Sequence, residues 1–220
     1  MGDFFNYDNK IMQALSKLFD VCYVSVLWVL ACLPIFTIGA ATTALYYTVN
    51  KVVRHSRGYV WKDFWGAFRS NFKQSTIVWL VVMAASALMV FDTYVMWKVA
   101  AAGQSIGKIY LFFTVVEIFV IMWAIYLFAY IARFENTTKA IMKNAAIIAF
   151  ANLPRTLLML VILAIGVLGI YLINYLIIAI PGICAWLMSY PLETIFRKYM
   201  SEEERKAEDE RNGEYAVEEK

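Results

Sequence analysis

The chain contains 220 residues, of which 62% are apolar or aromatic and only 17% are charged. A typical soluble domain has about 45–50% apolar and about 25% charged residues, and one core of this size cannot bury so large an excess of apolar surface. The composition therefore excludes a disordered chain, a collagen and an ordinary soluble enzyme. It predicts an all-α integral membrane protein, a polytopic helical bundle with five or six transmembrane helices.

The charges are unevenly distributed, although their sum is only +3. Residues 197–220 are predicted to be a charged cytoplasmic tail, in which a capping box at Ser201–Glu204 opens a short solvated helix. They carry six basic and nine acidic side chains, or −3, which leaves +6 for the rest. A basic body favours contact with anionic lipid headgroups at the cytoplasmic face. No basic stripe lies outside the membrane-flanking segments, which argues against nucleic-acid binding. The three cysteines lack metal-ligand spacing, so we expect neither a metal nor another cofactor.

Apolar runs divide residues 1–196, which we interpret as a single transmembrane domain. A helix that crosses a bilayer needs about 20 apolar residues. The predicted spans cover residues 21–38, 40–53, 75–97, 109–132, 156–173 and 176–196. The second is short and diluted by Thr and Asn, so it either crosses fully or is a re-entrant helix. The last two share a charge-free run too long for one crossing, and we place its reversal at Asn174.

The positions of the basic residues predict how the chain is oriented. With six crossings and both termini in the cytoplasm, 18 basic residues lie inside and only Lys98 and Lys108 outside. Cytoplasmic loops of membrane proteins are enriched in Lys and Arg, as this arrangement requires. An acidic N-terminal segment disfavours the alternative that residues 21–38 are a cleaved signal peptide. We therefore expect a multi-pass protein with cytoplasmic N- and C-termini.

Two predicted cytoplasmic loops each contain an amphipathic stretch, at residues 61–73 and 134–149. At 100° per residue, the aromatic side chains of the first fall within one stripe: Trp61, Phe64, Trp65, Phe68 and Phe72. In the second, Lys139 and Lys143 lie opposite an apolar face. Such helices are typical of the headgroup plane of a membrane. The alternative is that they bind another protein.

Several short blocks carry a family resemblance. They are Leu33–Gly39, Thr43–Tyr47, Trp61–Phe64, Phe68, Asn71–Gln74, Arg133–Asn136, Lys143–Ala145 and Asn152–Arg155. On these residues the chain up to its acidic tail resembles the YesL family of small bacterial integral membrane proteins. One departure is Ala40, where a proline often follows the glycine in that family. The resemblance implies a bacterial cell-membrane protein without established catalytic or ligand residues.

The members of that family have no assigned biochemical activity and are often encoded near carbohydrate-uptake systems of the ABC type. The resemblance therefore implies an accessory or regulatory role linked to carbohydrate uptake, with such a transport complex as the expected partner. We expect no enzymatic activity, because no nucleophile–base pair, phosphate-binding loop or metal-ligand motif occurs.

Two carboxylates inside predicted spans are the alternative basis for a function. Asp92 and Glu117 both fall in the outer halves of adjacent spans, where they could face one another and hold a proton or a cation. This arrangement favours a small transporter or channel. A structural role, in which each carboxylate makes an ordinary hydrogen bond, is the competing interpretation. We interpret Asp20 and Glu193 as structural, because they lie near cytoplasmic span ends where a charge reaches the headgroups at little cost. We interpret His55 as a solvent-exposed loop residue.

Overall fold

The computed structural model describes residues 10–218, with side chains for residues 12–210. Every regular element in that range is a helix, which confirms the predicted all-α class. The α-helices are α1 Lys10–Ala31, α2 Ile38–Thr48, α3 Val60–Ala101, α4 Tyr110–Arg133, α5 Thr138–Ala151, α6 Leu153–Leu172, α7 Ile180–Tyr199 and α8 Glu202–Glu218. Short turns connect them: η2 Ile35–Thr37, the π-helical η3 Val49–Arg54, η4 Ser105–Ile109 and η5 Asn174–Ile178.

Four helical segments in the described part of the chain are long and apolar enough to cross a membrane. They are Met12–Ala31, Val60–Ala101, Ser105–Arg133 and Leu153–Leu172. The predicted spans 40–53 and 176–196 are not among them. Helix α2 has 11 residues and continues without a break into the six residues of the π-helical η3, which together remain shorter than the about 20 residues that a crossing needs. Helix α7 carries Glu193, Arg197 and Lys198 in its C-terminal half.

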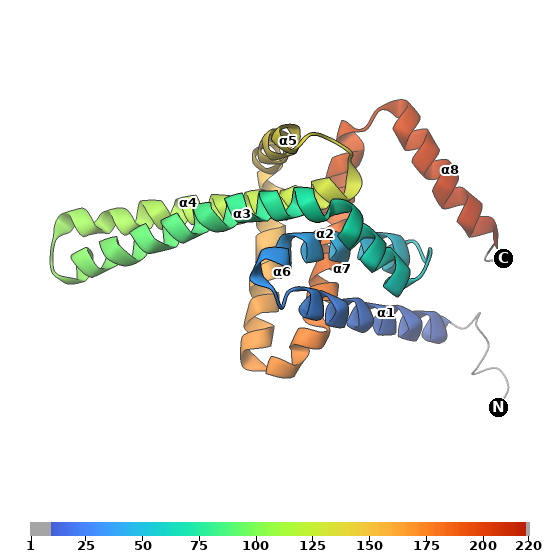
Figure 1. The fold of residues 1–220 in the computed structure, drawn as a ribbon, viewed down its shortest axis with the longest axis horizontal. Helices are drawn as coiled ribbons and strands as arrows, with labels where there is room; N and C mark the ends of the chain where they lie inside the picture. Colours follow the sequence, from blue (N-terminus) through green and yellow to red (C-terminus); the bar gives the residue numbers. More distant parts are fainter. Residues whose placement is uncertain (1–9, 219–220) are drawn as a thin grey trace.

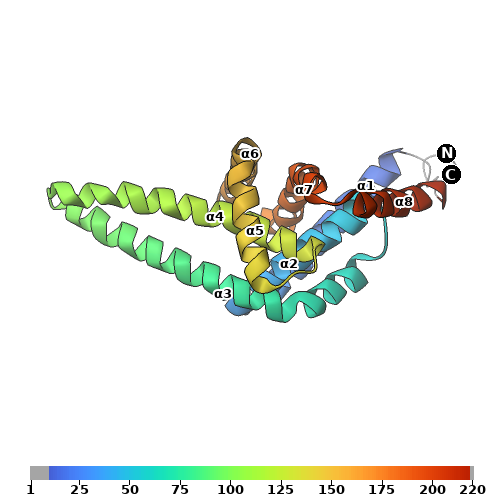
Figure 2. The same cartoon turned by 90° about the horizontal axis from the view of Figure 1, so that it is seen from above.

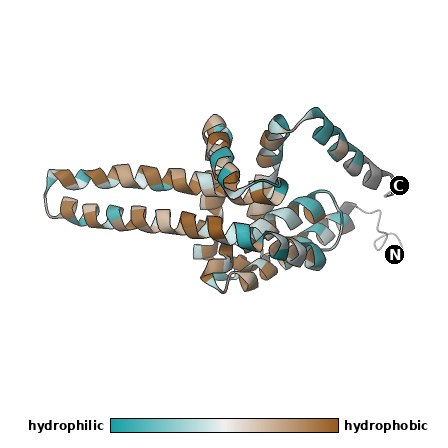
Figure 3. Ribbon diagram, turned by 45° about the horizontal axis from the view of Figure 1, so that its top comes forward, coloured by the Kyte–Doolittle hydropathy of each residue, from teal (hydrophilic) through white to brown (hydrophobic). Residues whose placement is uncertain are grey.

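The helices form two antiparallel hairpins, one of α3 and α4 and one of α6 and α7 (Figure 1). We call α1, α2, α5, α6, α7 and the segments of α3 and α4 that pack against them the body. Helices α3 and α4, joined by η4, extend well beyond the rest of the chain, and we call this hairpin the arm. Helices α6 and α7, joined by η5, run across the direction of the arm in both views (Figures 1 and 2). The turn of that second hairpin lies at Asn174, where the sequence predicts the reversal. Apolar residues line the arm along most of its length (Figure 3).

Helix α3 differs most from the sequence interpretation. The amphipathic stretch 61–73 and the predicted span 75–97 form one continuous helix of 42 residues, since no proline separates them. The helix changes direction between its aromatic start and the arm (Figure 2). Helix α5 begins at Thr138 rather than at residue 134, because the Thr137 side chain accepts a hydrogen bond from the Ala140 backbone N–H and caps the helix there.

The short helix α2 is buried between α1 and α3 because its residues are small. Ala40, Ala41 and Ala44 have no exposed surface, and close approach of small residues is a common way for helices to pack in membranes. A Cβ atom on Gly39 would lie 2.5 Å from the Cβ atom of Trp79 and 2.6 Å from the Ser75 carbonyl oxygen. Only glycine therefore fits at position 39, where α2 crosses α3. This close packing fixes α2, and η3, which continues from its end, lies beside α7.

Candidate functional site

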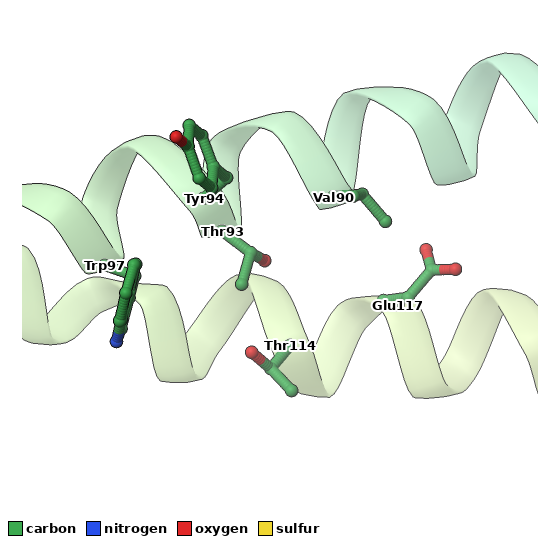
Figure 4. Close-up of a pocket in the computed structure, with 6 residues that line it drawn as sticks. All are labelled: Val90, Thr93, Tyr94, Trp97, Thr114 and Glu117. Carbon is green, nitrogen blue, oxygen red and sulfur yellow. The ribbon is translucent and has the colours of Figure 1, made fainter.

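The arm contains a cavity of about 340 Å³ between α3 and α4 (Figure 4). Its lining residues are Val90, Thr93, Tyr94, Trp97, Thr114 and Glu117. Asp92 does not line it, so the structure does not bring the two predicted carboxylates together at this cavity. Consecutive residues of a helix point about 100° apart, and here it is Thr93 rather than Asp92 that is directed toward α4.

Two polar groups of this cavity lack partners, whereas the Thr114 hydroxyl donates to the Tyr110 carbonyl oxygen at 2.9 Å. The Glu117 Oε2 and Thr93 Oγ1 atoms are both buried, and neither makes a hydrogen bond within the described chain. Buried polar atoms normally do so, because an unpaired one loses its hydration without compensation. The Lys98 ammonium lies over the neighbouring rings of Tyr94 and Trp97, 5.4 and 5.8 Å from their centroids. The cavity can therefore accept hydrogen bonds from a small donor or cation.

The aromatic stripe at the start of α3 mostly packs inside the protein. Phe64 is fully buried, and Trp65 and Phe68 pack against the core formed by α1, α2 and η3. Phe72 is half-buried against the Phe68 ring, and only Trp61, 56% exposed, faces outward. The prediction that these rings lie at the membrane surface or contact a partner is therefore wrong for the buried Phe64. It stays a prediction for Trp61, Trp65, Phe68 and Phe72, which keep exposed surface.

Beside Trp61 lies a groove of about 530 Å³ with basic edges. It is lined by Trp61, Lys62, Trp65, Gly66 and Arg69. The Trp65 Nε1 atom is buried and has no acceptor among the described residues. Lys62 and Arg69 are exposed. An indole donor next to two cations suits an anionic group such as a phosphate or a carboxylate.

Helix α5 uses one face for packing and exposes the other. Ile141 and Ala145 are completely buried, and the Trp123 indole nitrogen donates to the Met142 carbonyl oxygen at 3.0 Å. Lys139 and Lys143 are exposed on the outer side, as the sequence predicts. The adjoining loop is linked to α3, because the Gln74 Nε2 atom donates to the Asn136 carbonyl oxygen at 2.8 Å.

The sequence interpretation misses a buried ionic cluster in the body. Glu193 of α7 is 2% exposed, although we expected it to reach the headgroups. Its Oε1 atom accepts hydrogen bonds from the Tyr46 hydroxyl at 2.8 Å and from Asn50 Nδ2 at 3.0 Å. Its Oε2 atom lies 3.3 Å from Arg133 Nη2. The same Arg133 nitrogen contacts the Glu208 carboxylate of α8.

These five residues come from α2, η3, α4, α7 and α8, so no local spacing could reveal the cluster. The usable signal was an acidic residue two positions after Pro191, in a helix that is otherwise uncharged until its last turn. Burying an ion pair costs hydration, which only close geometry and further hydrogen bonds offset. Glu193 has both, and it therefore ties three segments of the body together.

The surroundings of the cluster are strongly basic. The Arg54 Nη1 atom donates to the Ser189 carbonyl oxygen at 3.0 Å, and its guanidinium stacks 4.9 Å from the centroid of the Tyr190 ring. Burial, together with the charges of Arg57 and Arg54, lowers the pKa of His55 to about 4. His55 is thus half-buried and neutral at pH 7, rather than the solvent-exposed loop residue that the sequence suggests.

Residues 21–93 match the family described as "Protein of unknown function, DUF624". The match covers about a third of the chain, from α1 through α2 to Thr93 in the arm. The chain is thus similar to that family over the segments that contribute Tyr46, Asn50 and the groove beside Trp61. No curated protein and no solved structure matches the chain.

Proposed function

We propose that this protein is a non-catalytic accessory or regulatory component of the bacterial cell membrane, linked to carbohydrate uptake. The carbohydrate link rests on the resemblance to the YesL family. The observation that supports a partner-binding role is the outward placement of cations on two helices whose apolar faces pack internally. Lys62 and Arg69 are exposed on α3, and Lys139 and Lys143 are exposed on α5.

In this proposal both termini lie in the cytoplasm, and so do these four cations. Lys98 and Lys108 lie near the far end of the arm, at the opposite end from the body (Figure 1). This distribution agrees with the general enrichment of Lys and Arg in the cytoplasmic segments of membrane proteins. The exposed cations would then contact anionic headgroups and an acidic surface of a carbohydrate ABC transport complex, because charge complementarity steers such encounters.

The test is recovery of the tagged full chain from native membranes in a mild detergent. We expect a transport complex to co-purify with the wild type and to be lost when Lys139→Glu and Lys143→Glu are combined. Lys108→Glu, an equally exposed reversal at the tip of the arm, should retain the complex. Isolation of the wild type as a lone species, or equal loss in the tip variant, would contradict the proposal.

The second candidate function is a small transporter or channel that uses the arm cavity. The unpartnered Glu117 Oε2 and Thr93 Oγ1 atoms are the observation that favours it. The chain would be reconstituted in liposomes with an entrapped pH-sensitive dye to follow proton flux. We expect Glu117→Gln to abolish the flux and Asp92→Asn, whose side chain does not line the cavity, to leave it unchanged. Absence of wild-type flux, or equal effects of both variants, would exclude Glu117 as the proton carrier.

A further inference from the structure

Helix α8 is docked on the body in an unusual way. We expected this tail to be a solvated charged helix opened by a capping box at Ser201, and the box is present: the Ser201 backbone N–H donates to Glu204 Oε2 at 2.8 Å. Of the α8 residues with described side chains, however, Glu208 is buried, with 7% exposure. The one group that α8 inserts into the body is therefore a carboxylate, and it meets Arg133.

Charge, rather than apolar packing, holds the described part of α8. Besides the contact between Glu208 and Arg133, the second ion pair joins Arg197 to Asp209 at 2.7 Å, between side chains that are 45% and 57% exposed. An exposed pair of this kind contributes little, about 0–1 kcal/mol, and salt screens it. Of the two ion pairs, the one with Arg133 therefore contributes more to the docking of α8.

The Arg133–Glu208 contact does not use the full capacity of either group. Arg133 Nε and Glu208 Oε2 are both buried without a hydrogen-bond partner, whereas an Arg–carboxylate pair at its strongest forms two parallel hydrogen bonds. Glu193 differs, because Tyr46 and Asn50 hold its other oxygen. Of the two carboxylates that contact Arg133, Glu193 is held by further hydrogen bonds. Glu208 is not, so another carboxylate can replace it on Arg133.

We propose that Arg133 forms a carboxylate-binding site that α8 fills within the same chain through Glu208. Helix α8 is then a latch that a competing acidic segment releases. Release exposes one face of the Arg133 guanidinium, next to the basic residues of η3, to a carboxylate supplied by another molecule. The inference is independent of the carbohydrate link and of the arm cavity.

The experiment measures amide hydrogen exchange of α8 in the intact chain, in lipid nanodiscs. We expect Glu208→Gln to speed exchange of residues 202–210 by about threefold to tenfold, since docking protects the helix from opening. Glu210→Gln is the matched control, because it removes the same charge from the same helix at an exposed position. Raising NaCl from about 0.05 to about 0.5 M should change exchange only modestly and similarly in all three chains, because salt screens the nearly buried Glu208 pair far less than the exposed Arg197–Asp209 pair that they share.

A competitor separates an exchangeable site from a fixed ion pair. Poly-L-glutamate, compared with NaCl at matched ionic strength, should speed α8 exchange in the wild type and leave Glu208→Gln unchanged. Equal exchange in Glu208→Gln and Glu210→Gln at both salt concentrations would overturn the latch. No effect of poly-L-glutamate beyond that of NaCl would overturn the exchangeable site.

Discussion

Two glutamates, one in each hydrophobic region of the molecule, have opposite environments. Glu193 in the body is fully buried and meets a tyrosine, an asparagine and an arginine. Glu117 in the arm has a buried oxygen with no partner. A carboxylate that is saturated with partners serves to connect helices, whereas an unsatisfied one in an apolar hairpin is a site that awaits a proton, a cation or a donor. From this comparison we expect the body to set the stability of the fold, and we propose ligand chemistry for the arm.

Glu193→Ala should produce the largest effect. The substitution leaves the mostly buried Arg133 with one ion-pair partner, Glu208, and the weak contact to the Met200 sulfur. Removal of one partner of a buried pair costs about 3–5 kcal/mol. Thermal unfolding of the full chain in detergent measures the loss. Glu117→Ala is the matched substitution in the arm, and it should not destabilise the protein comparably. Equal losses in both variants would remove the distinction between the two glutamates.

Tyr46→Phe tests whether hydrogen bonds saturate Glu193. The variant removes one donor to a buried carboxylate, which is worth about 1.5–3 kcal/mol, and keeps the ring in the core. We expect a lower unfolding temperature than the wild type, but a smaller decrease than with Glu193→Ala. Because both variants act on one group, Tyr46→Phe should add little to Glu193→Ala in the double variant. Full additivity would show that Tyr46 acts independently of Glu193.

Glu117→Leu probes the other side of the comparison and should change stability in the opposite direction. An unpaired carboxylate in a membrane helix is unfavourable by up to about 3 kcal/mol, so an apolar replacement should stabilise the folded chain by about 1 kcal/mol or more. Unfolding in lipid nanodiscs measures the change. A decrease in stability would mean that Glu117 has a structural partner and that the cavity is not a site for ligands.

The comparison also shows what the sequence can predict. Hydrophobic runs predict the all-helical membrane class and the reversal at Asn174, because these depend on local composition. The spacing of Ser201 and Glu204 predicts the capping box, because it depends on local backbone geometry. Register and packing decide the rest. Asp92 and Thr93 are neighbours in the sequence, yet only Thr93 lines the cavity, and Phe64 resembles an interfacial residue until the packing of α1 and α2 covers it. The Glu193 cluster joins residues far apart in the chain, which no local pattern encodes.

His55 should produce the smallest effect, and it tests how strongly the basic surroundings of the body act. The pKa of His55 is lowered to about 4 by burial and by Arg57 and Arg54, while in the unfolded chain the ordinary value is about 6.5. As the pH falls from about 6.5 toward 4, the unfolded state takes up a proton that the folded state resists, so the free energy of unfolding decreases. Because His55 is only half-buried, solvent screening limits the loss. His55→Gln lacks this proton, so its unfolding temperature should fall less than that of the wild type over the same pH range. The difference between the two chains isolates the contribution of His55 from those of the carboxylates. Parallel curves would show that neither burial nor the charges of Arg57 and Arg54 lower the pKa of His55.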